Sequence, residues 1–187
     1  MEAGREVSRK SIRVLRLGFR FVRDDRTITH LCLVSRALGA EAILLEEVEP
    51  DLLKTVQEVN QTWGGSFGVE EARPWSKVIK AAKDEGRKVV HLTMYGLPIE
   101  EKMEEMRRED SFLVVVGGPK VPRDVYTQAD YNIAVTSQPH SEIAALAIFL
   151  HELQEGKELK GEFPKSRLKI VPQDRGKRVT NNQQGSR

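Results

Sequence analysis

The chain has 187 residues, of which 39% are hydrophobic and 31% charged, and its formal net charge is +2 at pH 7. This length fits one compact domain with short extensions. The sequence has no apolar run near the roughly 20 residues of a membrane span and no secretory signal, which argues against a membrane or secreted protein. The single cysteine, Cys32, excludes an intrachain disulfide and argues against a cysteine-based zinc site. We therefore expect a cytoplasmic protein without a metal.

The charges are distributed unevenly along the chain. Residues 1–30 carry eight Lys or Arg against four Asp or Glu, and residues 151–187 carry nine against five, whereas residues 31–150 carry thirteen against nineteen. Basic ends around an acidic body suit a protein that binds a phosphate backbone. Charge alone fits solvated faces and a flexible tail equally well.

Apolar runs and amphipathic stretches alternate along most of the chain. The pattern predicts strands at residues 12–18, 40–45, 66–72, 88–95, 111–117 and 131–136, and helices at 28–38, 51–60, 75–85, 99–108 and 142–153. Residues 111–117 (SFLVVVG) form a continuous apolar run, which is typical of a buried parallel strand. The alternation predicts an α/β fold with a mainly parallel sheet and helices on both faces. Residues 156–187 are polar and basic, and we expect them to form a flexible carboxyl-terminal extension.

Three loops after the last three predicted strands contain glycine, proline and polar residues. They are residues 93–98 (TMYGLP), 117–122 (GGPKVP) and 136–142 (TSQPHSE). Ligands of parallel α/β sheets bind outside the carboxyl ends of the strands, where such loops meet. Glycine allows a ligand to approach the backbone closely, and Ser137 or Ser141 is placed to cap the following helix. One such loop is usually only a turn, but three on consecutive strands favour a pocket.

The nature of the ligand is narrowed by the motifs that are absent. The sequence lacks G-x-G-x-x-G after its first strand, and it lacks the phosphate-binding G-x-x-x-x-G-K-[ST]. The loops therefore suit an adenosine-like ligand without a phosphate, and S-adenosylmethionine meets that description.

Most of the chain resembles one enzyme family. Residues 91–96 (HLTMYG), 114–122 (VVVGGPKVP) and 131–147, together with an arginine-rich front end at residues 15–40, are similar to the archaeal tRNA (cytidine(56)-2′-O)-methyltransferases. The resemblance covers about residues 12–153. That family belongs to the SPOUT superfamily, whose carboxyl-terminal half is threaded as a trefoil knot.

The resemblance implies a fold, a reaction and an assembly. It implies a single SPOUT domain over residues 1–155 with the knot at about 88–153, and a homodimer. The implied reaction is S-adenosylmethionine-dependent 2′-O-methylation of the ribose of a T-loop cytidine, position 56, in tRNA. The implied donor pocket comprises Leu92, Thr93, Met94, Tyr95, Gly96, Gly117, Gly118, Pro119, Lys120, Val121, Ile133, Ala134, Val135, Thr136, Ser137, Gln138, Pro139 and His140.

The apolar members of this pocket have two readings. Backbone groups of the loops would bind the adenine, and Leu92, Val121 and Ile133 would sandwich its faces. Without the family, core packing is the preferred role of these three residues. His140 fits either a pocket role or a hydrogen bond to a loop carbonyl.

The catalytic group is harder to assign. A ribose hydroxyl is a poor acid, so its activation calls for a nearby positive charge or a base. Related ribose methyltransferases use an arginine near the first helix, but their spacing is not clearly reproduced here. We predict Arg23 and Arg26 as the catalytic residues, and the further candidates are Arg20, His30 and Arg36. Each of them also suits a phosphate contact or a surface ion pair.

Three alternatives remain open at the level of sequence. The chain fits a SPOUT enzyme with another target nucleotide, or a nucleotide-binding enzyme that acts on a small metabolite. It also fits a non-catalytic tRNA-binding protein, although its aromatic content of 6% is low for such a module.

Overall fold

The structure is a computed structural model that describes residues 10–18, 25–118 and 121–182. Its first half contains β1 (Ser11–Leu17), α1 (Asp25–Ala37), β2 (Ala42–Leu45), α2 (Pro50–Trp63), β3 (Gly68–Glu71), α3 (Trp75–Asp84) and β4 (Lys88–Pro98). Its second half contains α4 (Ile99–Met106), β5 (Ser111–Gly117), α5 (Arg123–Gln128), β6 (Tyr131–Ala134), α6 (Glu142–Gln154), the 3-10 turn η1 (Lys157–Lys160), β7 (Leu168–Val171) and β8 (Arg178–Asn181).

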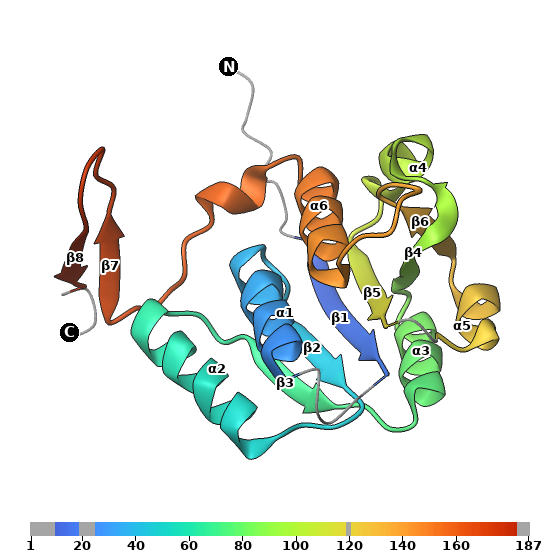
Figure 1. Cartoon of the computed structure of the whole chain (residues 1–187), viewed down its shortest axis with the longest axis horizontal. Coiled ribbons are helices and arrows are strands. Elements are labelled where there is room, and N and C mark those ends of the chain that lie inside the picture. The colour runs from blue at the N-terminus through green and yellow to red at the C-terminus, as the bar shows by residue number, and fades with distance from the viewer. Residues whose placement is uncertain (1–9, 19–24, 119–120, 183–187) are drawn as a thin grey trace.

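The first six strands form one parallel sheet in the order β3-β2-β1-β5-β4-β6 (Figure 1). β1 and β5 lie at its centre, paired along their whole length from Ser11 opposite Ser111 to Leu17 opposite Gly117. β5 buries five consecutive residues, as its continuous apolar run predicts for a strand covered on both faces. The predicted α/β fold with a parallel sheet is confirmed.

Helices cover both faces of the sheet, as predicted. One face packs against α1, α2, α4 and α6, whose buried residues include Leu31, Val56, Met106 and Phe149. The other face packs against α3 and α5, which contribute Ile79 and Val125. Burial of these apolar stripes is the main stabilising contribution in a layered fold of this kind.

Two parts of the structure differ from the sequence-based expectation. α5 was not predicted, because six residues following Pro122 are too few to display a helical period. Beyond residue 155 we expected only a flexible extension, but this segment contains η1 and an antiparallel pair, β7 and β8. In the ranges that the structure describes, no helix has the length and apolar character of a membrane span. The trefoil knot and the domain boundary at residue 155 stay predictions.

Because the six strands are parallel, their carboxyl ends lie along one edge of the sheet. A bulge near the end of β4 and the loops after β5 and β6 lie at this edge, and so do the amino ends of α1 and α6. We call it the carboxyl edge. The opposite, amino edge carries the last turns of α1 and α6, since the hydrogen bond from Glu41 N to Ile12 O places the end of α1 beside the start of β1.

Candidate functional site

The first loop of the site is a bulge within β4. Leu92 and Leu97 are both in register with Ile133 of β6, so residues 93–96 are extra on the β4 side. Gly96 is required there, because a Cβ on it would lie 2.5 Å from the backbone carbonyl of Asn132. The bulge lifts Tyr95 away from the sheet, and its side chain is 76% exposed.

A buried polar network holds the base of this bulge. His91 is 1% exposed, and its Nδ1 lies 2.9 Å from Oδ1 of Asn132. The amide of Asn132 donates to the carbonyl of Tyr126 at 2.9 Å, and the Tyr126 hydroxyl lies 3.3 Å from Oγ1 of Thr93. Burial lowers the pKa of His91, while the hydrogen bond to Asn132 acts in the opposite direction. The network thus links β4, α5 and β6. The lowered pKa favours the neutral form of the His91 imidazole within it.

The second loop follows β5. A Cβ on Gly117 would lie 2.4 Å from Cγ2 of Val121, so this glycine permits a tight return of the chain. A Cβ on Gly118 would meet nothing within 4 Å, and its N–H faces the carbonyl of Leu17 at 3.4 Å. Gly118 therefore borders open space at the carboxyl edge. Pro119 and Lys120, which we also predicted for the pocket, lie outside the described residues.

The third loop joins β6 to α6. Oγ1 of Thr136 accepts a hydrogen bond from Gln138 N at 3.3 Å, and Oγ of Ser141 caps α6 by accepting from Ile143 N at 3.2 Å. The cap predicted at Ser137 or Ser141 is thus provided by Ser141. Residues 136–140 are all exposed, and Nδ1 of His140 lies 3.2 Å from the carbonyl of Ser141. The amino end of α6 consequently faces the same edge as the other two loops.

The predicted apolar residues of the pocket lie deeper than its loops. Leu92 is 8% exposed, Ile133 1% and Ala134 5%, and Leu92 and Ile133 belong to the main core. Val121 is half-buried and packs against the second core cluster. Core packing accounts for these side chains without a ligand, so the polar loops offer the more accessible surface.

The candidate basic residues separate into two groups. Arg26 lies exposed in the first turn of α1, at the carboxyl edge, and His30 is exposed one turn further along. Arg20 and Arg23 lie outside the described residues. Arg36 is 8% exposed in the last turn of α1, at the amino edge, where it contacts Phe163 and Asn60. Arg36 is therefore removed from the catalytic candidates, because the length of the sheet separates it from the loops.

One buried charge at the carboxyl edge escaped the sequence analysis. Arg16, 4% exposed at the end of β1, donates to the carbonyl of Gly18 and lies 3.5 Å from Oε1 of Glu142 in α6. The pair links the end of β1 to the amino end of α6, beside the loops. The available signal was the place of Arg16 between Leu15 and Leu17 in a predicted strand, since an arginine is rarely buried without a partner. Within the described ranges, no three His, Cys, Asp or Glu residues are grouped as metal ligands.

Comparison with known proteins gives this edge a context. The profile of the family described as tRNA ribose 2′-O-methyltransferase, aTrm56, matches residues 63–180. A tRNA (cytidine(56)-2′-O)-methyltransferase of Nitrosopumilus maritimus is 50% identical over 168 residues, which are 90% of this chain and 95% of the relative.

Solved structures agree in fold. A crystal structure of an RNA 2′-O ribose methyltransferase matches with a TM-score of 0.62 at 16% identity, over 84% of this chain and 60% of that one. The SpoU methyltransferase AviRb of Streptomyces viridochromogenes, in complex with the cofactor AdoMet, matches with a TM-score of 0.54 at 11% identity, over 79% and 58% of the two chains. The chain thus has the SPOUT fold and belongs to the tRNA ribose 2′-O-methyltransferase family aTrm56.

Proposed function

We propose that this protein transfers the methyl group of S-adenosylmethionine to the ribose 2′-hydroxyl of cytidine 56 in tRNA. The observation that carries the proposal is a 50% identical relative of that name, matched over 95% of its length. The carboxyl edge supports it, because the bulge of β4 and the loops after β5 and β6 meet there beside Arg26 in the first turn of α1.

The residues of the carboxyl edge fit the methyl donor. Gly118 borders open space that a side chain would enter, and residues 93–96 bulge out of the β4–β6 ladder, where their backbone groups would bind an adenine. The amino end of α6 adds a positive partial charge beside these loops, which suits the carboxylate of the donor's methionine part. We infer that the predicted pocket residues of the three loops hold the donor, with Leu92 and Ile133 supporting the loops from the core.

Bound in this pocket, S-adenosylmethionine supplies a methyl group that its sulfonium already activates for transfer. The remaining task is to align the 2′-oxygen and to assist the loss of its proton as the new C–O bond forms. We assign this task to Arg23 and Arg26, whose positive charge would stabilise the developing negative charge on that oxygen. Arg26 supports the assignment by lying exposed on α1 at the carboxyl edge.

We also infer a homodimer in the cytoplasm. Leu33 of α1 is 37% exposed and Ile148 of α6 is 46% exposed, on two helices that pack against each other. Exposed apolar side chains on adjacent helices suit a contact with a second copy of the chain.

The proposed function is tested by incubating the protein with labelled methyl donor and unmodified tRNA and then mapping the label. We expect the label on the ribose of cytidine 56. A control tRNA that already carries the 2′-O-methyl group at this nucleotide should accept no label. Labelling at another nucleotide, or binding of tRNA without transfer, would contradict the proposal.

A further inference from the structure

A buried arginine anchors the segment that leads to the carboxyl-terminal hairpin. The guanidinium carbon of Arg36 lies 4.5 Å from the centroid of the Phe163 ring. Its Nε donates to Oδ1 of Asn60 at 3.0 Å, and its Nη2 donates to the carbonyl of Gly64 at 2.5 Å. A stacked, hydrogen-bonded and desolvated arginine of this kind is a strong attachment.

Backbone contacts reinforce the attachment at the end of α2. Gly65 N donates to the carbonyl of Pro164 at 2.8 Å, and Arg167 N donates to the carbonyl of Thr62 at 3.1 Å. A Cβ on Gly64, whose φ is +82°, would lie 2.6 Å from the carbonyl oxygens of Phe163 and Pro164. The base of the hairpin is therefore built into the fold at the amino edge.

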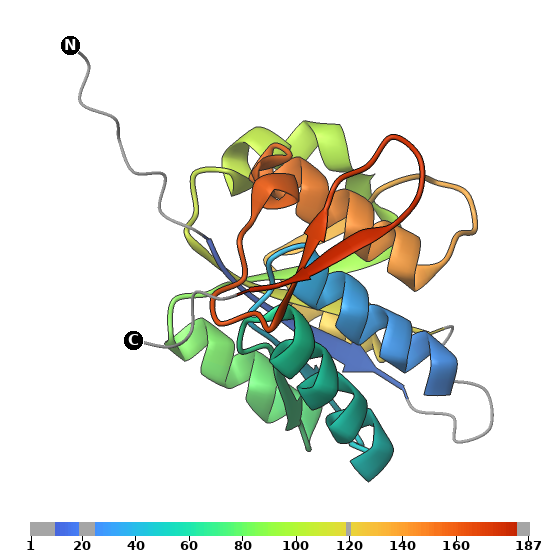
Figure 2. The ribbon, with the colours of Figure 1, turned by 90° about the vertical axis from the view of Figure 1, so that its left-hand side faces the viewer.

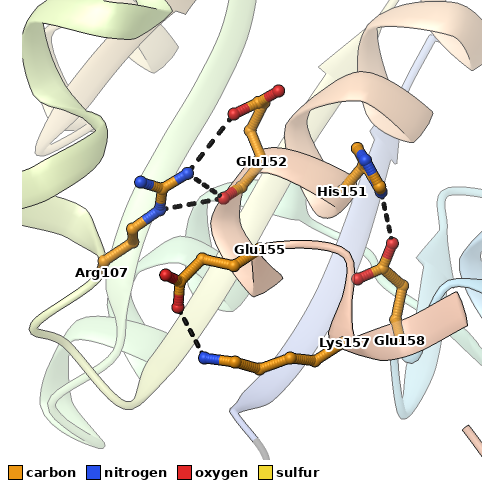
Figure 3. Close-up of polar contacts among 6 residues, drawn as sticks. All are labelled: Arg107, His151, Glu152, Glu155, Lys157 and Glu158. Carbon is orange, nitrogen blue, oxygen red and sulfur yellow. Dashed lines mark hydrogen bonds and ion pairs between the residues drawn. The ribbon is translucent and has the colours of Figure 1, made fainter. Parts of the chain in front are cut away.

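The connection from α6 is also tied to the body (Figure 3). Arg107 donates from Nη2 to the carbonyl of Glu152 at 2.7 Å, and Nδ1 of His151 lies 2.7 Å from Oε1 of the buried Glu158. Lys157 pairs with Glu155 at 2.6 Å. The chain before the hairpin is therefore attached to the body at two places, at the end of α6 and at the end of α2. These attachments fix the direction in which the hairpin projects.

The hairpin itself stands apart from the layers at one end of the molecule, with α2 as its neighbour (Figure 1), and it lies in front of α6 and the end of α1 when viewed from that end (Figure 2). One of its faces carries Ile170 opposite Val179, which are 62% and 49% exposed. The other face carries Lys169 opposite Thr180 and Val171 opposite Arg178. An isolated two-stranded hairpin is marginally stable in water, so such an element usually has a partner.

The charge of the hairpin indicates the partner. Residues 163–182, which we call the arm, contain a single acidic residue, Asp174, against six exposed basic residues: Lys165, Arg167, Lys169, Arg175, Lys177 and Arg178. Among the described residues, Arg175 is the one of these six that has an ion pair, with Asp174, and both of those side chains are more than nine-tenths exposed. The other five cations are available to a polyanion.

We propose that the arm is a second tRNA-binding surface, which grips the phosphate backbone away from the methyl-transfer pocket. The proposal rests on the proposed function, because tRNA is the polyanion that this enzyme must bind. The arm is rooted at the amino edge, and the seven residues of β1 place the loops of its own chain about 20 Å away. The arm would therefore contact part of the tRNA other than the methylated nucleotide. Contacts to phosphates fix the position of the nucleic acid and do not read its sequence.

A second copy of this chain is the less suitable occupant of the arm. The same surface on the other copy would bring an equal positive charge, and only Ile170 and Val179 offer an exposed apolar contact there. A surface of lysine and arginine around two apolar residues is complementary to a phosphate backbone. It is not complementary to the same positively charged surface of another copy.

The test uses the full-length protein and filter binding of unmodified tRNA over a range of salt concentrations. Lys169→Ala with Arg178→Ala removes two charges of the basic face, and Lys77→Ala with Lys80→Ala removes two charges of α3 on the other side of the sheet. We expect the arm variant to bind tRNA about tenfold more weakly. Its affinity should also depend less steeply on salt, with the magnitude of the slope of log K against log salt reduced by about 1.5. The α3 variant should bind as the wild type does, and donor binding should be retained in both.

The outcomes separate this inference from the proposed function. Wild-type tRNA binding by the arm variant would overturn the arm as a binding surface, whether or not methyl transfer occurs. Ile170→Thr with Val179→Thr probes the other face: conversion of a dimer into monomers by this variant, with tRNA affinity unchanged in the arm variant, would assign the arm to a second copy. A wild-type protein that binds tRNA through the arm but methylates another nucleotide would overturn the proposed target and leave the arm assignment intact.

Discussion

The guanidinium of Arg36 stacks on the ring of Phe163, with 4.5 Å between its Cζ and the ring centroid. The two residues lie far apart in the sequence, and their contact joins α1 to the start of the arm. Because Arg36 is 8% exposed, water screens this contact poorly, and its contribution to stability is larger than that of a surface pair.

We predict that a double-mutant cycle of Arg36→Met and Phe163→Leu shows a coupling of about 1–2 kcal/mol in the free energy of unfolding. Arg36→Met alone should cost more, about 3 kcal/mol, because the carbonyl of Gly64 and Oδ1 of Asn60 also lose a donor. Urea denaturation measures both quantities. Additive effects of the two substitutions would show that the stacking contributes nothing of its own.

The buried His91 predicts a pH dependence of stability. Burial holds its pKa below the ordinary 6.5, so the unfolded chain binds a proton at this residue that the folded chain does not. Stability should be complete above pH 6.5 and should fall as the pH drops below it, at no more than about 1.4 kcal/mol per pH unit for one proton. Thermal unfolding between pH 7.5 and 5 measures this slope.

The matched variant is His91→Gln, which keeps a polar side chain beside Asn132 and cannot titrate. It should be less stable than the wild type at pH 7.5 and should lose less stability on acidification. A wild-type slope that persists unchanged in His91→Gln would assign the acid sensitivity to other groups.

The two glycines nearest the predicted ligand should respond in opposite ways. Gly118 borders open space and its φ lies outside the left-handed region, so Gly118→Val should fold normally and weaken donor binding by tenfold or more. Gly96→Ala should instead destabilise the protein, because its Cβ would lie 2.5 Å from the backbone of Asn132. Calorimetry with S-adenosylmethionine and thermal unfolding distinguish the two effects. Donor affinity of Gly118→Val equal to that of the wild type would move the pocket away from this loop.

The core of this fold is predictable from sequence, whereas its arm is not. β5 is evident because five consecutive buried residues leave an unbroken apolar run, and α6 is evident because it is rich in alanine and leucine. No residue in the strands of the arm is fully buried, so these strands leave no clear pattern of burial in the sequence.

The candidate site was predictable only as far as its loops. Glycine and proline after consecutive strands identified the carboxyl edge, but Arg36 and Arg26 are indistinguishable as letters near the same predicted helix. The role of each arginine depends on which end of α1 it occupies. Arg36 lies in the last turn, where it contacts Phe163 and has a structural role. Such long-range contacts have no local signature.

The proposed homodimer predicts an effect of charge on the exposed face of α1 and α6. Leu33→Glu with Ile148→Glu should convert a dimer into monomers at micromolar concentration and reduce methyl transfer, since each charge would have to be buried in the interface. Light scattering measures the mass. Leu159→Glu is the control, because Leu159 is 67% exposed in η1, outside these two helices. A wild-type protein that is fully active as a monomer would contradict the assembly.

Substitutions of the arginines between β1 and the body of α1 should distinguish a catalytic role from a role in tRNA binding. An arginine that only binds phosphate acts through counterion release. Its loss should weaken tRNA binding and reduce the magnitude of the slope of log K against log salt by about one. An arginine that assists loss of the 2′-hydroxyl proton acts in the transition state, so its loss should lower turnover by roughly 10²-fold and leave tRNA affinity nearly unchanged. We predict the second pattern for Arg23→Ala and Arg26→Ala, and the first pattern for Arg20→Ala.

Single-turnover methylation at saturating tRNA, with filter binding in parallel, distinguishes the two patterns. Arg26→Lys is the matched variant, because it keeps the charge in the first turn of α1 and changes the geometry of the donors. It should recover part of the rate that Arg26→Ala loses. If neither Arg23→Ala nor Arg26→Ala slows transfer, the catalytic assignment is wrong and His30, exposed one turn along α1, becomes the next candidate, because Arg36 is committed to Phe163 at the other edge.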